Sequence, residues 1–199
     1  MEPLFLLLFI PMLICSVMFH EIAHGLVALW YGDNTAKRAG RLTLNPIAHL
    51  DLFGSILLPG ALMLFGSPVV LAWAKPVPIN PLRFSNYRWG VFWVSAAGII
   101  TNFLIGLIAA LAFRVFSVEF LAIIALLNFG LAFFNLLPIP PLDGLSLFAA
   151  LCNATEKAEE VVARMGIFGF FILFMLLWSL QIGHFIFQLS YGLLALIAS

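Results

Sequence analysis

Residues 4–31 read LFLLLFIPMLICSVMFHEIAHGLVALWY, a nearly unbroken apolar run. A helix of about 20 residues crosses the hydrocarbon layer of a membrane, so this run is long enough to span it. The run is followed by a Gly-Asp-Asn sequence, which can end a helix and turn the chain. Its strongly polar side chains are confined to His20, Glu21 and His24. We therefore predict a transmembrane helix that carries these three side chains near its far end.

The rest of the chain is also unusually apolar. Of its 199 residues, 64% are hydrophobic and only 9% are charged, and the mean hydropathy is +1.14. A soluble core of this length could not hide so much apolar surface. No run alternates apolar and polar residues as the strands of an outer-membrane barrel do. The composition predicts an all-α polytopic membrane protein with about four to six transmembrane helices.

The balance of charges argues against nucleic acid as a partner. Nine Lys and Arg residues balance nine Asp and Glu residues, and no basic stripe with interleaved aromatic residues occurs. The electrostatic attraction on which nucleic-acid binding depends is therefore missing. The two cysteines, Cys15 and Cys152, form no Cys-x-x-Cys pair and lie in or beside apolar segments. We expect both to act as small hydrophobic residues.

Two segments after the first run have a less regular pattern. Residues 37–45 read KRAGRLTLN and alternate around Leu42, so we predict a short strand or hairpin there. Residues 52–74 are apolar, but prolines and glycines interrupt them and basic residues flank them on both sides. The positive-inside rule would place both flanks in the cytoplasm. We therefore predict that 52–74 is re-entrant, entering and leaving the membrane on one side.

The second half of the chain contains the remaining predicted spans. Residues 89–113 and 120–137 are predicted to cross the membrane in opposite directions around a tight turn. Residues 153–164 are hydrophilic with alternating charges, which fits a short surface helix. Residues 166–198 are apolar over ~50 Å if wholly helical. That length exceeds one crossing unless the helix tilts strongly or breaks near Gly183.

HEIAH at residues 20–24 fits the pattern HExxH. Histidines four residues apart lie on one face of an α-helix, and both can bind one zinc ion. Glu21 then lies where it can take a proton from a zinc-bound water. Ionisable groups inside a membrane helix cost roughly 2.5 kcal/mol or more each, so three of them together require a function or partners. The alternative is a helix end that rises into water.

Asp143 is the best candidate for the third ligand that a catalytic zinc site needs. It follows an apolar span within PIPPLDG at residues 138–144, where three prolines prevent a regular helix. Irregular backbone at membrane depth persists only where protein buries it or water reaches it, and hydrolysis needs that water. The alternative is that Asp143 is a plain helix cap in a turn.

The two motifs can meet only if the intervening chain crosses the membrane twice. A full crossing by 52–74 would leave His24 and Asp143 near opposite faces, whereas a re-entrant segment brings both to the cytoplasmic side. Asn135, at the end of its span, could donate a hydrogen bond to the substrate backbone or to a developing oxyanion, or could bond to a neighbouring helix. His49 could be an outer partner of the metal, although we favour a role in fixing its loop.

With these residues in view, the sequence resembles a known family, the site-2 proteases, which are intramembrane zinc metallopeptidases. HEIAHG at 20–25 and NLLPIPPLDG at 135–144 look like the two signature motifs of that family. Three further stretches are similar to its short bacterial branch: RLTLNPIAHLD at 41–51, WAKPVPIN at 73–80 and AGIITNF at 97–103.

The resemblance implies a set of site residues. The zinc ligands would be His20, His24 and Asp143, with Glu21 as general base and Asn135 and Asn102 as substrate contacts. One Zn²⁺ per chain is implied as the cofactor. Ile99 departs from the proline that the family usually has there, which would alter local packing without touching the metal. The chain resembles short members without PDZ or CBS domains, so the substrate and the regulator are left open.

We therefore expect an intramembrane zinc metalloprotease that cuts transmembrane proteins or peptides within the lipid bilayer. It would lie in the cell membrane of a prokaryote, with its active site toward the cytoplasm and its oligomeric state undetermined. We expect a single domain over 1–199, with a catalytic core over 4–150 and a C-terminal transmembrane region over 166–198. The competing hypothesis is a zinc transporter or metal-binding membrane protein. That hypothesis explains Glu21 and the PPLDG motif poorly.

Overall fold

Helices make up all the regular structure that is described for this chain. The computed structural model describes residues 3–57, 60–61, 64, 74–165 and 181–198. The elements in chain order are α1 (Pro3–Trp30), α2 (Thr35–Arg38), η1 (Pro46–His49), η2 (Leu52–Leu57), η3 (Pro81–Arg83), α4 (Tyr87–Phe116), α5 (Glu119–Asn135), α6 (Asp143–Leu151) and α8 (Ile182–Ala198). Residues 155–165 are helical as well. The all-α architecture predicted from the apolar runs is confirmed over the residues described.

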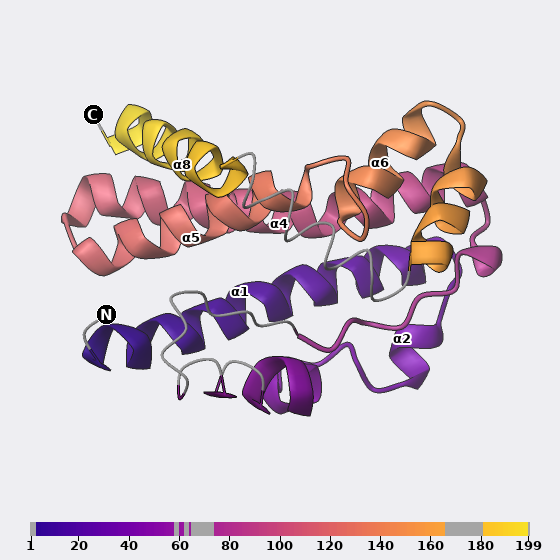
Figure 1. The fold of residues 1–199 in the computed structure, drawn as a ribbon, viewed down its shortest axis with the longest axis horizontal. Helices are drawn as coiled ribbons and strands as arrows, with labels where there is room; N and C mark the ends of the chain where they lie inside the picture. Colours follow the sequence, from indigo (N-terminus) through magenta and orange to yellow (C-terminus); the bar gives the residue numbers. More distant parts are fainter. Residues whose placement is uncertain (1–2, 58–59, 62–63, 65–73, 166–180, 199) are drawn as a thin grey trace.

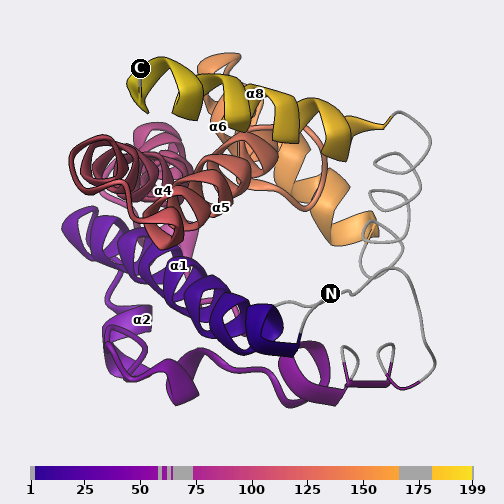
Figure 2. The same cartoon turned by 90° about the vertical axis from the view of Figure 1, so that its left-hand side faces the viewer.

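The long helices α1, α4 and α5 run side by side, and α8 packs on the outer side of α5 (Figure 1). Helix α4 is central, because it contacts α1, α5, α6 and α8. Seen from a direction turned by 90°, α2 and the chain around it lie on the side of α1 away from α5 (Figure 2). Small residues permit this close packing. Gly106 of α4, for example, lies directly against the ring of Phe129 in α5, which is fully buried.

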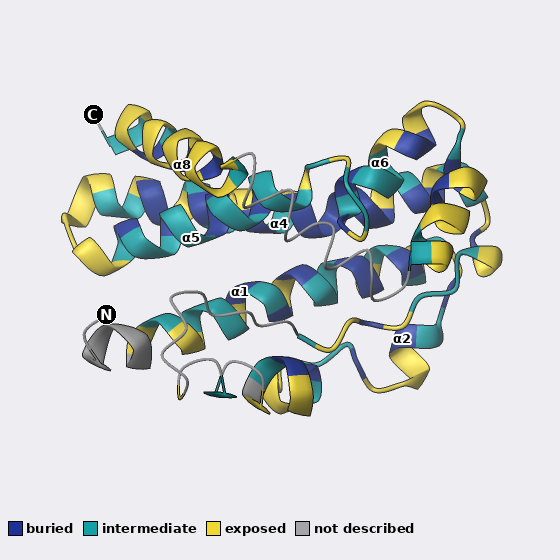
Figure 3. Ribbon diagram, viewed as in Figure 1, coloured by how far each residue is buried: buried dark blue, intermediate teal, exposed yellow. Residues whose placement is uncertain are grey.

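The outer faces of the bundle carry large apolar side chains. Buried residues line the contact between α4 and α5, while the outward face of α8 is exposed (Figure 3). Two of the described helices are long and apolar enough to cross a membrane, over Leu8–Trp30 and Tyr87–Phe116. Helices α5 and α8 are apolar but shorter, with 17 residues each. Extended exposed apolar surface of this kind fits contact with lipid. The total number of spans stays a prediction.

The prediction of a strand or hairpin over 37–45 is wrong. Thr35–Arg38 forms the helix α2, and the chain leaves it through Gly40, which has a φ of 65°. The N–H groups of Gly40 and Arg41 bond back to carbonyls of α2 at 3.1 and 3.0 Å, which is a Schellman ending. The alternation around Leu42 had suggested a strand, but a strand needs a neighbouring strand to satisfy its backbone. Here turns and helix ends satisfy it instead.

The two flanks of the predicted re-entrant segment lie side by side. The backbone N–H of Lys75 donates to the carbonyl of His49 at 2.9 Å. The guanidinium of the buried Arg41 donates in turn to the carbonyl of Lys75 at 2.6 Å. The chain therefore leaves this place after His49 and returns to it at Lys75. Most of 52–74 lies outside the described residues, so its path through a membrane stays a prediction.

Asp33 joins the end of α1 to the returning chain. Its fully buried carboxylate accepts hydrogen bonds from the backbone N–H of Thr35 at 3.0 Å and of Asn80 at 2.6 Å, and from the Thr35 hydroxyl. Burial opposes ionisation of this carboxyl group, but the hydrogen bonds outweigh it and lower the pKa of Asp33. Asp33 therefore holds together the segments that precede and follow 52–74.

The later helices begin and end close to the predicted positions. Helix α4 extends slightly beyond both ends of the predicted span and stops before Ser117, which has a φ of 53°. Helix α5 ends at Asn135, and the hydrophilic stretch is helical over 155–165. Residues 166–180 lie outside the described part of the chain. Helix α8 begins at Ile182. Whether the last apolar run tilts strongly or breaks near Gly183 stays a prediction.

Candidate metal centre

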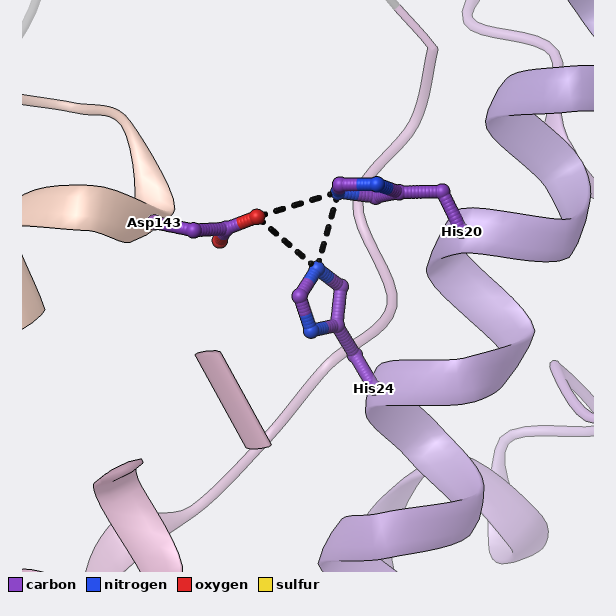
Figure 4. A group of neighbouring side chains, drawn as sticks. All are labelled: His20, His24 and Asp143. Carbon is purple, nitrogen blue, oxygen red and sulfur yellow. Dashed lines mark hydrogen bonds and ion pairs between the residues drawn. The ribbon is translucent and has the colours of Figure 1, made fainter. Parts of the chain in front are cut away.

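Side chains from α1 and α6 form a compact polar cluster. His20 and His24 lie one turn apart on α1 and point toward Asp143, the first residue of α6 (Figure 4). The Oδ2 atom of Asp143 is 3.1 Å from Nε2 of His20 and 3.2 Å from Nε2 of His24. The two Nε2 atoms are 2.9 Å apart. The structure thus brings together the three residues that were predicted as ligands of one ion.

The position of Asp143 is fixed from both ends of α6. Gly144 packs so tightly that a Cβ there would collide with two carbonyl oxygens of the preceding turn. Glycine is therefore required beside the aspartate. At the other end, Arg88 of α4 donates hydrogen bonds of 2.6 and 2.8 Å to the last carbonyls of α6, those of Ala150 and Leu151. These contacts hold α6 against α4 with Asp143 directed at the histidines.

Each histidine uses its other ring nitrogen to contact α4. Nδ1 of His24 is 2.6 Å from the backbone carbonyl oxygen of Val94, and Nδ1 of His20 is 2.6 Å from the side-chain Oδ1 of Asn102. Because a carbonyl oxygen only accepts, each Nδ1 must carry the hydrogen. A neutral ring then presents the lone pair of its Nε2 atom to Asp143. Partners of this kind orient histidines that bind metals.

The three converging atoms are therefore all acceptors when the rings are neutral. His20 and His24 are 7% and 6% exposed, and Oδ2 of Asp143 is buried with no hydrogen-bond donor. Buried acceptors that lack a donor cost free energy. One proton can satisfy only one pair of these atoms, whereas a single metal ion can satisfy all three. Two imidazoles and a carboxylate form the ligand set of known catalytic zinc sites.

The size of the cluster also fits zinc. Zinc binds nitrogen and oxygen ligands at about 2.0–2.1 Å, which separates neighbouring ligand atoms of a tetrahedron by about 3.3 Å. The three separations here, 2.9, 3.1 and 3.2 Å, need only small adjustments. Calcium fits neither the size nor the ligand types, because it takes six to eight oxygen ligands at about 2.3–2.6 Å.

Gly98 of α4 forms the wall behind both histidine rings. An added Cβ would lie 2.5 Å from Cε1 of His20 and 2.5 Å from Nε2 of His24. Only glycine lets α4 approach closely enough for Val94 and Asn102 to contact the rings. Sequence reasoning did not identify Gly98 as a site residue, because its role follows from the packing of two helices.

Glu21 lies beside the cluster but is not one of the three converging residues. Its Oε2 atom accepts a hydrogen bond of 2.7 Å from the backbone N–H of Val77. Val77 belongs to the chain that returns after 52–74, so this segment reaches the centre of the site. Sequence reasoning did not identify Val77 as a site residue, because it contributes its backbone N–H, and nearly every residue type has one.

A cavity of about 350 Å³ opens beside the cluster. Its lining includes the three converging residues and Glu21, together with side chains of α4, the 76–81 segment and α6. Asn135 also lines it, and the amide nitrogen of this residue donates to the carbonyl of Leu131 at 3.0 Å. Asn102, in contrast, is fully buried behind His20. Contact of either asparagine with a substrate stays a prediction.

His49 has the structural surroundings expected of a loop-fixing residue. It is 1% exposed, and its Nε2 atom donates to the carbonyl of Thr43 at 3.0 Å. Its own carbonyl accepts the hydrogen bond from Lys75. Both contacts stay within the chain that flanks 52–74.

Comparison with known proteins adds evidence of a separate kind. A family model described as Peptidase family M50 matches residues 114–177. This range contains Asn135 and Asp143, whereas the HEIAH motif lies before it.

Two relatives share the printed name "Putative zinc metalloprotease". YwhC of Bacillus subtilis (strain 168) is 37% identical over 188 residues, covering 87% of this chain and 81% of that protein. Rip2 of Mycolicibacterium smegmatis is 27% identical over 183 residues, covering 88% of this chain and 68% of that protein. No solved structure matches this chain.

Proposed function

This chain belongs to peptidase family M50, and on that premise we propose that it is a zinc metalloprotease that hydrolyses peptide bonds of transmembrane substrates. Membership in this family confirms the resemblance to the site-2 proteases that was inferred from the two motifs. One observation carries the proposal further: two histidine nitrogens of α1 and a carboxylate oxygen more than 100 residues away in the sequence converge as buried acceptors, with no donor between them.

In this proposal His20, His24 and Asp143 hold one zinc ion. When bound, zinc supplies a Lewis acid that polarises a peptide carbonyl and makes a coordinated water more acidic. The protein contributes the arrangement of the ligands. Val94 and Asn102 keep hydrogens on the outer ring nitrogens, and Arg88 holds the helix that carries the carboxylate.

Glu21 acts as the general base. Its carboxylate takes a proton from the attacking water while the water oxygen bonds to the carbonyl carbon of the substrate. Glu21 then returns the proton to the leaving nitrogen as the C–N bond breaks. The hydrogen bond from Val77 holds this carboxylate in the cavity during both transfers. Asn135 lines the same cavity, and its amide nitrogen has a second hydrogen beside the one that bonds to Leu131. In this proposal it donates that hydrogen to the substrate backbone or to the developing oxyanion.

The cavity and the apolar helices suggest where the reaction takes place. The cluster is formed by α1 and α6 and lies against α4. Among the described helices, α1 and α4 are the two that are long and apolar enough to cross a membrane, so the substrate would be a membrane-spanning protein or peptide. The contact between His49 and Lys75 supports a re-entrant 52–74 with both flanks in the cytoplasm. We place the active site toward the cytoplasmic side of a prokaryotic cell membrane, within a catalytic core over 4–150.

Metal analysis of detergent-purified protein, combined with cleavage of a transmembrane model substrate, tests the proposal. We expect about one zinc per chain and its loss in His20→Ala, His24→Ala and Asp143→Ala. Glu21→Gln should keep zinc and lose cleavage by about 10²- to 10⁴-fold, because an amide cannot take the proton. Glu119→Gln, at the start of α5, is the matched control and should cleave normally.

Each contrary result has a definite meaning. Near-normal cleavage by a zinc-loaded Glu21→Gln variant would show that Glu21 is not the general base. No cleavage by the zinc-loaded, unchanged protein would favour the zinc-transporter hypothesis. Loss of zinc in Glu21→Gln would mean that the ligand and the base are misassigned. Full retention of zinc in Asp143→Ala would remove Asp143 from the ligand set.

A further inference from the structure

A chain of buried polar side chains crosses three helices behind His20. Asn102 of α4 and Asn128 of α5 are fully buried, and Ser16 of α1 is 5% exposed. Burying polar groups in an apolar bundle costs free energy unless hydrogen bonds compensate for it. Neither Asn128 nor Ser16 belongs to the proposed ligand set or lines its cavity. Their presence beside His20 therefore calls for a separate explanation.

The orientation of both amides follows from the backbone carbonyls that they contact. Nδ2 of Asn128 donates to the carbonyl of Ile124 at 3.0 Å, so Oδ1 of the same amide faces Asn102. Nδ2 of Asn102 donates to that Oδ1 at 3.0 Å and to the carbonyl of Ser16 at 3.3 Å. The hydroxyl of Ser16 accepts a further bond of 3.0 Å from Nδ2 of Asn128. Oδ1 of Asn102 is thereby left to face Nδ1 of His20.

This orientation determines which nitrogen of His20 carries the hydrogen. If the Asn102 amide were turned round, its N–H would face Nδ1, and a neutral ring would have to carry its hydrogen on Nε2. That hydrogen would point at His24 and Asp143, and Nε2 could not bind a metal ion. The observed orientation leaves the lone pair of Nε2 directed into the cluster.

We infer that Asn128 is a positioning residue for the metal centre. Acting through Asn102, it holds His20 in the tautomer that binds zinc, and Ser16 reinforces the arrangement. The inference rests on the proposed zinc site, but it concerns Asn128 of α5, which belongs neither to the proposed ligand set nor to the lining of the cavity. Outer partners of metal-binding histidines typically contribute about 10- to 100-fold in metal affinity.

Zinc affinity, measured by competition with a chelator in detergent, tests the inference. Asn128→Leu replaces the amide with an apolar group of similar size and should weaken zinc binding by about 10- to 100-fold. Ser190→Ala is the matched control, because Ser190 is also buried in an apolar helix, and its hydroxyl donates to the carbonyl of Ile186 in the same helix. Its zinc affinity should equal that of the unchanged protein. Asn128→Ala, which cannot overpack, serves if Asn128→Leu does not fold.

A double-mutant cycle separates positioning from simple packing. In Asn102→Asp, both side-chain oxygens are acceptors. Whichever oxygen faces His20 can therefore accept the hydrogen on its Nδ1. Asn128→Leu should therefore change zinc affinity by no more than about threefold in the Asn102→Asp background. Equal losses in both backgrounds would show that Asn128 only packs the helices and would overturn the inference.

The same measurements distinguish failure of the inference from failure of the proposed function. If the unchanged protein binds no zinc, the proposed metal site itself is wrong. If the unchanged protein binds zinc and Asn128→Leu binds it equally well, only the positioning role of Asn128 is wrong. Nitrogen chemical shifts of ¹⁵N-labelled histidine provide an independent readout in the metal-free proteins. In the unchanged protein, Nδ1 of His20 should be the protonated nitrogen. In Asn128→Leu, Nε2 should be protonated instead.

Discussion

The backbone N–H of Val77 donates a hydrogen bond of 2.7 Å to the carboxylate of Glu21, although 56 residues separate the two in sequence. Val77 lies between two prolines, which have no N–H to offer and favour an extended backbone. The segment therefore presents one donor at this point, directed at the proposed general base. Glu21 is held by the chain that returns from 52–74, and this contact links the path of that chain to the chemistry.

Val77→Pro removes this donor and should lower kcat by about tenfold or more, because a hydrogen bond to a charged group contributes roughly 1.5–3 kcal/mol. Zinc content should not change, since the three ligands keep their own contacts. Val77→Ala, which retains the N–H, is the control and should keep most of the activity. Equal kcat values for the two variants in single-turnover cleavage would show that the hydrogen bond does not position Glu21.

Gly98→Ala should abolish zinc binding, because the added methyl group would lie 2.5 Å from atoms of both histidine rings. The rings or α4 would have to move, and the three ligand atoms would no longer converge. Gly130→Ala in α5 is the control, since its added Cβ would have only one ordinary contact, at 3.9 Å. Zinc stoichiometry after purification measures the effect. Normal zinc content in Gly98→Ala would mean that the two helices are further apart than described.

Cysteines introduced at Lys37 and at Arg83 should be labelled from the same side of the membrane, because the flanks of 52–74 are hydrogen-bonded to each other. The test uses an impermeable thiol reagent on intact cells and on inverted vesicles, in a background without Cys15 and Cys152. A cysteine at Val118, between α4 and α5, should be labelled from the opposite side. Labelling of the two flanks from opposite sides would contradict a re-entrant segment.

Asp33→Asn should destabilise the protein at neutral pH by about 1–3 kcal/mol, because the isosteric amide leaves buried donors less well satisfied. Thermal unfolding would then shift down by several degrees. Since the pKa of Asp33 is lower in the folded than in the unfolded protein, its contribution is fully present above the unfolded value of about 3.9 and is lost as the pH falls through the folded value. The two proteins should therefore differ at pH 7 and converge in strong acid. A constant difference across this range would show that ionisation of Asp33 does not stabilise the fold.

Local sequence was sufficient to predict most of the described helices and the three residues that converge, because helical periodicity, hydropathy and the histidine spacing act over a few residues. His20 and His24 lie on one face of a helix by geometry alone, and the prolines before Asp143 end the preceding span. The prediction of a strand over 37–45 was wrong because alternation does not reveal whether a partner strand exists. The position of Asn102 behind His20 also depends on packing between α1 and α4, which no single segment encodes.

The hydrogen bond between Lys75 and His49 has a consequence for evolution. Because the ends of the intervening chain meet at this point, insertions or deletions between them would leave the spacing of the proposed metal ligands unchanged. This segment could therefore diverge in length among homologues, and it offers a place to graft a foreign sequence and alter selectivity without rebuilding the catalytic framework.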